Sequence, residues 1–359
     1  MIASLVSLSV SASAADCPSV GAIRWDAWYG ADTGPSRAVE QSLGPAKWHH
    51  RLPTCARALN DNVVKIDCGS AQEMAVEIDQ AKQAGLEYWA FDVYPEGDPM
   101  SGGLNAYLAS PAKSKLNFAI LSEFSKWQGR SGYRKVLTRY VNLMKDPSYE
   151  KVSDGRPLMF IAFINDAAME KEFGGRSQTA SAIGELRDMA KSAGLKNPYI
   201  VLLDGNVEKA RGLIHDLGLE SISAYSVADN SVKNGQYRQL ADMAEAFWAR
   251  ASSAGLGVVP IAMAGWDRRP RVMKPVPWEA PPESSDQIEH FYNAPTPEEL
   301  SAHVAAAMRW AKHSTSAHTV LIYAWNEFDE GGYIAPTVGA GTTRLDAVHK
   351  AVASVCSDR

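Results

Sequence analysis

The chain has 359 residues, of which 46% are hydrophobic and 21% are charged, with 27 Gly, 19 Pro, 10 Trp and 4 Cys. This composition excludes a disordered chain and a small scaffold held together by disulfides. The net charge of −5, with the basic residues scattered, argues against a nucleic-acid partner, because phosphate binding needs clustered Lys and Arg.

The first fifteen residues have features of a signal peptide. They carry no charged side chain, include the apolar run 2–10 and end in small residues that favour cleavage after Ala14 or Ala15. We predict a signal peptide at 1–15 and a secreted or periplasmic protein. The basic segment that usually opens a signal peptide is missing, so a frayed apolar N-terminus is the alternative. No segment is apolar over the length that a membrane span needs.

Strands and helices alternate along the rest of the chain. Apolar, β-rich runs predict strands at 21–28, 87–94, 117–124, 158–164, 199–203, 221–226, 258–263 and 319–325. Helical patterns lie at 71–84, 133–144, 179–193, 206–217, 239–254 and 297–312, and several end in Gly followed by an apolar residue. Eight such units predict an α/β fold, a (β/α)8 TIM barrel with a parallel sheet. A dinucleotide-binding fold is disfavoured, because no glycine-rich turn follows the first strand.

Two long loops enlarge the predicted barrel. The first covers 29–70, and the second, at 265–297, holds seven prolines. We expect both loops at the carboxyl ends of the strands, where such loops form walls or lids, although a stiff surface excursion is the alternative for the second. We find no linker, and therefore predict a single catalytic domain at 16–359.

The four cysteines suit an oxidising compartment. Of the three possible pairings we favour Cys55 with Cys68, which closes a short loop, and Cys17 with Cys356, which ties the two ends together. Neither a CxxC pair nor an HExxH motif occurs, and the histidines are dispersed. We therefore predict no metal site and no cofactor.

Barrel enzymes keep their chemistry at the carboxyl ends of the strands. Aromatic rings and carboxylates gather there in this sequence, and such a set suits a sugar, whose ring faces stack on aromatics while its hydroxyls bind polar groups. Asp92 and Asp204 have an alternative role as helix caps. We predict that Trp89, Trp248 and Trp310 belong to the core. The candidate sugar-binding residues are Trp25, Asp26, Trp28, Tyr29, Asp92, Tyr94, Glu123, Asp204, Tyr225, Trp266, Trp325 and Asn326.

The most informative segment is 323–333, which reads Tyr-Ala-Trp-Asn-Glu-Phe-Asp-Glu-Gly-Gly-Tyr. Glu327 and Glu330 stand three positions apart after the last predicted strand. If the chain turns there, both carboxyl groups reach one pocket, and such a pair is what acid-assisted glycosidic cleavage requires. The alternative is an acidic helix N-terminus capped by Asn326 or Asp329.

This segment closely resembles the one after the last barrel strand in glycoside hydrolase family 99 and its relatives, the endo-α-mannosidase and endo-α-mannanase group with the WbsX-like proteins. Segments 21–30, 81–94 and 146–161 also resemble that family, and the α-1,3-glucanases of family 71 have a similar ending. The resemblance implies that Glu327 acts as a base on the substrate 2-hydroxyl, giving a 1,2-anhydro sugar, and that Glu330 protonates the leaving oxygen. Asp329 departs from the endomannosidases, which usually have His there, so α-mannose specificity is not carried over.

We therefore predict an exported, metal-independent, retaining and endo-acting glycoside hydrolase that cleaves a polysaccharide or oligosaccharide. The resemblance leaves two rivals, a glycan-binding barrel without catalysis and a WbsX-type glycosyltransferase that depends on an activated sugar donor. A further alternative keeps hydrolysis but makes Glu327 a direct nucleophile. The oligomeric state stays open.

Overall fold

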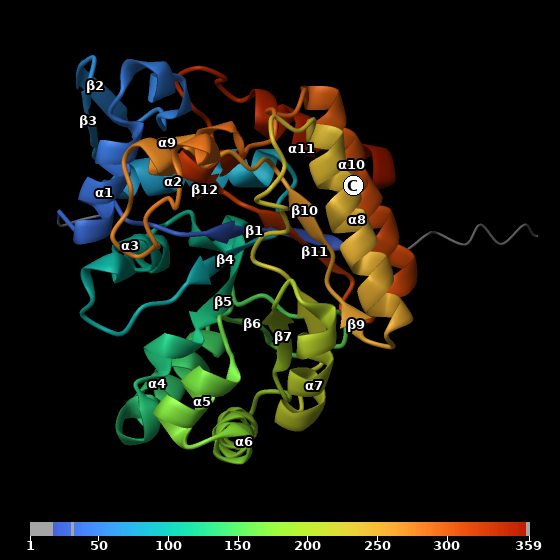
Figure 1. Ribbon diagram of the computed structural model, residues 1–359. Coiled ribbons are helices and arrows are strands. Elements are labelled where there is room, and N and C mark those ends of the chain that lie inside the picture. The colour runs from blue at the N-terminus through green and yellow to red at the C-terminus, as the bar shows by residue number, and fades with distance from the viewer. Residues whose placement is uncertain (1–16, 30–31, 357–359) are drawn as a thin grey trace, which may run out of the picture.

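A curled sheet of parallel strands forms the centre of the molecule (Figure 1). The computed structural model describes residues 17–29 and 32–356, so the predicted signal peptide lies outside the described residues. The strands lie in the order β10-β11-β1-β4-β5-β6-β7-β8-β9. Their bounds are β1 (Ser19–Arg24), β4 (Tyr88–Asp92), β5 (Asn117–Glu123), β6 (Leu158–Ala162), β7 (Tyr199–Leu203), β8 (Ser221–Ser223), β9 (Gly257–Val258), β10 (Ile261–Met263) and β11 (Thr319–Tyr323).

The two edge strands of this sheet follow each other directly in the chain. β9 pairs with β8 and β10 pairs with β11, and only Val259 and Pro260 separate them. Val259 donates its N–H to the carbonyl of Ile222 at 2.9 Å, and Leu321 donates to the carbonyl of Pro260 at 3.1 Å. The sheet therefore curls round onto itself at one interrupted strand. This confirms the predicted α/β, TIM-barrel-like fold, with the predicted strand 258–263 divided in two.

The strands form because their apolar runs are buried on both faces, as in other parallel sheets. Every residue of β4, β6, β7 and β11 is buried. Trp89 and Trp248 belong to the core that surrounds these strands, and Trp310 packs against it half-buried, as predicted. The interior of the barrel is therefore packed with side chains, and open space is confined to the strand ends and the loops.

Each predicted helix is present between the strands. Their C-terminal glycines Gly85, Gly194 and Gly255 adopt positive φ angles of 89°, 80° and 78°, the left-handed conformation that ends a helix. The confirmed helices are α2 (Ala71–Gln83), α4 (Gly129–Met144), α6 (Arg176–Ser192), α7 (Val207–Leu217), α8 (Tyr237–Ser253) and α10 (Pro297–Ser314). The sequence analysis missed α1 (Gly34–Leu43), α3 (Gly102–Ala109), α5 (Asp166–Phe173), α9 (Arg269–Met273) and α11 (Thr343–Val355).

The two long loops carry local structure of their own. The first contains α1, the 3-10 helix η2 (Ala46–Arg51) and a hairpin of β2 (Ala56–Asn60) and β3 (Val63–Ile66). The second contains α9 and η6 (Ser285–Glu289). Helices α1 and α9 contact each other, and Figure 1 shows them on the same side of the sheet. The two loops together wall one end of the barrel.

Both predicted disulfides are present. Cys55 and Cys68 lie with their Cα atoms 5.4 Å apart and close the hairpin loop, and Cys17 and Cys356 lie 5.7 Å apart. The second bond ties the start of the described chain to the end of α11. Within the described residues, no helix is long and apolar enough to cross a bilayer.

Candidate functional site

The segment after β11 folds into a tight hairpin. β12 (Asn326–Glu327) pairs antiparallel with β13 (Gly332–Tyr333), and the short 3-10 helix η7 (Phe328–Glu330) joins them. Gly331 turns the chain with a φ of 73°. A Cβ atom at Gly332 would lie 2.1 Å from the Tyr323 ring, so only glycine fits there. This backbone turn brings Glu327 and Glu330, both buried, into one cluster.

Arg271 of α9 connects the carboxylates of this cluster. Its Nε and Nη2 donate to the two carboxylate oxygens of Asp329, at 2.8 and 2.9 Å. Its Nη1 contacts Glu330 Oε1 at 2.5 Å and Glu279 Oε1 at 2.7 Å, and its Nη2 lies 3.5 Å from Glu327 Oε2. Burial alone would lower the pKa of Arg271, but the charges of Asp329, Glu330 and Glu327 raise it well above its usual value. The guanidinium therefore stays charged and fixes α9 against η7.

The two glutamates have different surroundings. Tyr225 donates its hydroxyl to Glu327 Oε1 at 2.5 Å, whereas Glu330 accepts from Tyr323 and also lies 3.3 Å from Arg268 Nε. Burial and the charge of Glu330 raise the pKa of Glu327 to about 8. At neutral pH, Glu327 is therefore largely protonated.

A second carboxyl pair lies at the ends of β4 and β5. Burial and the adjacent Glu123 carboxyl raise the pKa of Asp92 well above its usual range, and Asp92 Oδ1 is buried without a hydrogen-bond partner in the described part of the chain. Tyr94, two residues further on, accepts a hydrogen bond from Trp25 Nε1 at 2.8 Å. The charge of Asp92 also raises the pKa of Tyr225, the residue that donates to Glu327.

Exposed aromatic rings flank the carboxylates on two sides. Phe163, directly after β6, is 56% exposed, has a φ of 59° and packs against Tyr225 with ring centroids 5.7 Å apart. Trp278, in the second long loop, is 43% exposed and lies 5.8 Å from Trp25. Asn230 and residues of this loop, Trp266 among them, line a hollow of about 380 Å³. Such rings offer flat faces to a sugar.

Four predicted sugar-binding residues instead turn their polar groups into the protein, around the buried side chain of Arg24 and the half-buried side chain of Glu77. Arg24 forms ion pairs with Asp26 at 2.7 Å and with Glu77 at 2.5 Å. The other three donate into the same network: Tyr29 to Glu77 at 2.9 Å, Trp325 to Glu77 at 3.2 Å and Asn326 to Asp26 at 3.0 Å. The network therefore joins the end of β1 to Trp325 and Asn326 of the segment 323–333.

The remaining predicted residues have mixed surroundings. Trp28 packs on Phe328 of the motif, with ring centroids 5.6 Å apart. Trp266 lies 5.7 Å from the Tyr323 ring and donates its N–H to Asn230 at 2.9 Å. Asp204 accepts from the Asn206 N–H at 2.9 Å and from Lys209 Nζ at 2.5 Å. The N-cap of α7 is Asn206 and not Asp204.

Sequence analysis missed Arg268, Arg271, Tyr323, Phe163 and Trp278 as members of the site. The run Arg268-Arg269-Pro270-Arg271 directly after the seventh strand was an available signal, because so many cations at a strand end call for acidic partners. No comparable signal marks Phe163. Among the described residues, no group of three or more His, Cys, Asp or Glu is placed to hold a metal ion.

Comparisons with known proteins agree with this fold. A family model described as glycosyltransferase WbsX matches residues 119–348. The fold is similar to two structures of the GH99 endo-α-mannosidase from Bacteroides thetaiotaomicron. One, in complex with Bis-Tris propane, has a TM-score of 0.63 and 15% identity over 95% of this chain and 98% of that one. The other has a TM-score of 0.59 and 14% identity over 94% and 97%. No curated protein matches the sequence.

Proposed function

Because this chain belongs to the family described as glycosyltransferase WbsX and has the fold of a GH99 endo-α-mannosidase, we propose that it is a glycoside hydrolase whose reacting groups are Glu327 and Glu330. The observation that carries the proposal is the buried carboxyl pair at the end of the last strand. Its two members differ in surroundings, as the acid and the base of a glycosidase must. A glycan is the proposed substrate, and the action is retaining and endo.

The resemblance to family 99 assigns the roles in one order. Glu327 takes the proton of the substrate 2-hydroxyl, the oxygen attacks the anomeric carbon, and Glu330 protonates the leaving oxygen. Water then opens the 1,2-anhydro sugar with retention. Tyr225, which donates to Glu327, holds that carboxyl in place, and the exposed rings of Phe163 and Trp278 support sugar units on either side.

The charges around the two glutamates favour the opposite order. Glu327 has a pKa of about 8 and holds a proton at neutral pH, while Glu330 contacts both Arg268 and Arg271. A protonated Glu327 suits a general acid. The family order therefore requires that the proton leave Glu327 when a sugar hydroxyl enters the site.

A pair of variants tests both the function and the order. Glu327→Gln and Glu330→Gln should each lower kcat on a glycan by at least about a thousandfold, because each removes a reacting group. On an aryl glycoside with an acidic leaving group, which needs no protonation, the variant of the general acid should keep its activity. If Glu330 is the general acid, as in the family order, Glu330→Gln should keep its activity on the aryl glycoside. If Glu327 is the general acid, as its high pKa favours, Glu327→Gln should keep it instead.

Initial rates on a panel of α- and β-linked polysaccharides, with product analysis, provide the measurement. Glu208→Gln, an exposed glutamate on α7, is the matched control and should keep full activity. Full activity of either site variant on glycans would overturn the assignment.

The family description favours a second candidate, a glycosyltransferase. It predicts that turnover needs an activated sugar donor, and that glycan incubated with water alone stays intact. A glycan-binding barrel without catalysis predicts binding without product, and an affinity that the double Gln variant leaves unchanged. The two disulfides are typical of proteins outside the cytoplasm, which supports the proposed export.

A further inference from the structure

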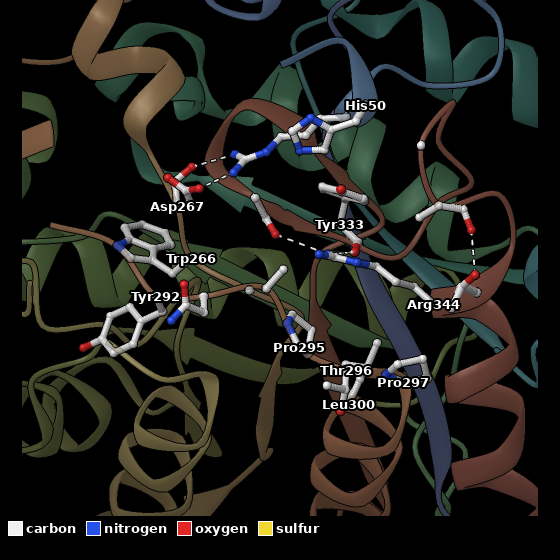
Figure 2. A pocket seen from close by; sticks show the side chains of 18 of the residues that line it. His50, Trp266, Asp267, Tyr292, Pro295, Thr296, Pro297, Leu300, Tyr333 and Arg344 are labelled. Atoms are coloured by element: carbon white, nitrogen blue, oxygen red, sulfur yellow. Dashed lines mark hydrogen bonds and ion pairs between the residues drawn. The ribbon is translucent and has the colours of Figure 1, made fainter. Parts of the chain in front are cut away.

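A second pocket shares the lining residue Trp266 with the hollow beside Arg271, and Figure 2 shows side chains that line this second pocket. Its volume is about 350 Å³, within the range of small-molecule sites and much larger than one inorganic oxyanion needs. η2, the start of the second long loop, the segment leading into α10 and the start of α11 form its walls. Nothing in the proposed acid–base chemistry uses this space.

Positive charge exceeds negative charge in the walls of this pocket. Arg51, Arg269 and Arg344 line it, and Asp267 is the one carboxylate among its lining residues in the described part of the chain. Arg51 and Arg269 both contact Asp267, which they share. His50 also lines the pocket. Burial and the charge of Arg51 lower the pKa of His50, so its ring is uncharged at neutral pH.

Arg344 is the cation that this arrangement leaves without an acidic partner. Its Nη1 donates to the carbonyl oxygens of Ala264, Gly331 and Tyr333, at 3.1, 3.3 and 2.6 Å, and none of the carboxylates in the described residues pairs with it. Figure 2 shows its guanidinium in the middle of the pocket, between Tyr333 and Pro295. A desolvated cation without a counter-charge is unfavourable, and an anion in the pocket would relieve it.

The rest of the lining suits a sugar ring. Trp266 and Tyr333 line the pocket with aromatic side chains, with the Arg344 guanidinium 3.9 Å from the Tyr333 ring centroid, and Pro295 contributes aliphatic surface. An arginine beside aromatic faces binds a carboxylate attached to a ring better than it binds a bare oxyanion, because the ring also buries apolar area.

The pocket is joined to the catalytic motif through shared backbone. Gly331, whose carbonyl binds Arg344, directly follows Glu330. Asp267 donates its N–H to the carbonyl of Glu330 at 2.6 Å. A ligand in the pocket therefore lies against the same turn that carries the reacting carboxyl group.

We propose that this pocket binds the carboxylate-bearing unit of an acidic glycan, a hexuronate, with Arg344 as the main anion-binding group. The inference rests on the proposed function, since the hexuronate is a unit of the chain that Glu327 and Glu330 cut. It names the substrate class, a uronate-containing glycan, and assigns the pocket as the subsite that recognises it.

Binding is measured by calorimetry at low ionic strength on the Glu330→Gln protein, so that hydrolysis does not interfere. Sodium glucuronate should bind saturably and glucose should not. Arg344→Gln should weaken glucuronate binding at least tenfold. Ala294→Trp, which fills the pocket from an exposed position of its rim and leaves every charge in place, should do the same. Arg309→Gln, an exposed arginine on α10, is the matched control and should bind as the parent does.

Three outcomes would overturn the assignment: glucuronate that binds no better than glucose, inorganic phosphate that binds as tightly as glucuronate, or Ala294→Trp with undiminished binding. The last decides the case if Arg344→Gln fails to fold. Acidic polysaccharides and their carboxyl-reduced forms then test the substrate class, because kcat/KM should fall at least tenfold on reduction. If glucuronate binds but Glu330→Gln remains fully active, the proposed function fails and the pocket stands.

Discussion

At the scale of single residues, one proton distinguishes Glu327 from the carboxylates beside it. Glu327 is surrounded by protein and by the charges of Glu330 and Asp329, which the charge of Arg271, at 3.5 Å, and the hydrogen bond from Tyr225 offset in part. The folded protein therefore keeps on Glu327 a proton that the unfolded chain releases above its ordinary pKa near 4.5. Between about pH 4.5 and pH 8, ionisation of Glu327 therefore disfavours the folded state.

The sign of the resulting pH dependence is fixed. Between about pH 4.5 and 8 the folded state binds the extra proton, so this group makes the free energy of unfolding fall as the pH rises. Glu327→Gln should remove the effect and stabilise the protein at pH 7 by on the order of 3 kcal/mol. Denaturant unfolding at pH 5 and pH 8 measures it.

Glu327→Gln should raise the free energy of unfolding more at pH 8 than at pH 5. Glu208→Gln on α7 should show no such dependence on pH. A Glu327→Gln protein that is less stable than the parent at pH 8 would contradict the raised pKa.

At the scale of elements, the site depends on the contact between a five-residue helix and a three-residue one. Arg271 of α9 reaches Glu327, Asp329 and Glu330 around η7, and Ser42 of α1 donates to Asp329 at 3.0 Å from the other loop. The Asp329 carboxylate, which stands where endomannosidases usually have His, is thus bound by a cation rather than left facing Glu330. Phe328 of η7 packs on Trp28, whereas α9 has no aromatic residue, so the ion pairs of Arg271 fix α9 against η7.

Arg271→Met should release α9 and leave the motif carboxylates without their cation. Removing one partner of a buried ion pair costs about 3 to 5 kcal/mol. Because Arg271 lowers the pKa of Glu327, that pKa should rise further in the variant, and the limb of the pH–rate profile that reports it should move to higher pH. Unfolding midpoints and the pH dependence of kcat/KM measure the two effects.

Arg238→Met, an exposed arginine on α8, is the control for both measurements. A merely structural role of Arg271 would lower stability and leave the pH–rate profile of the folded fraction unchanged, so a fixed profile would contradict the electrostatic role.

Elements were predictable where their pattern is local and strong. β7 was predicted at its observed bounds because its five apolar residues are buried on both faces. α9 was missed because five residues with a proline carry no helical period. The pair Glu327 and Glu330 was found because a single contiguous motif carries both. Arg271 was missed because its partners in the motif lie more than fifty residues away, and only the closed barrel brings them together.

At the scale of the whole molecule, two disulfides serve different parts. The bond between Cys17 and Cys356 closes a loop over 339 positions and joins the first strand to the last helix. The bond between Cys55 and Cys68 spans 13 positions and fixes the loop that carries Arg51 into the second pocket. In the chain-entropy model the longer loop stabilises more.

Cys17→Ser with Cys356→Ser should lower the free energy of unfolding by about 5 kcal/mol, against about 3 kcal/mol for Cys55→Ser with Cys68→Ser. Effects on the substrate should rank in the opposite order, because only the second bond adjoins the site loops. KM should rise in the Cys55 and Cys68 variant and stay unchanged in the other. Chemical denaturation and steady-state kinetics test the two rankings, and equal KM values would contradict the second.

Phe163 has a consequence for the balance between stability and activity. A large side chain in the left-handed region costs about 1 to 2 kcal/mol, and its ring gains little burial, since it is 56% exposed. Glycine would relieve the backbone there at once. Phe163 thus weakens the fold but presents an aromatic face beside Tyr225. Selection for thermostability should favour glycine at this position, whereas selection for activity should keep phenylalanine.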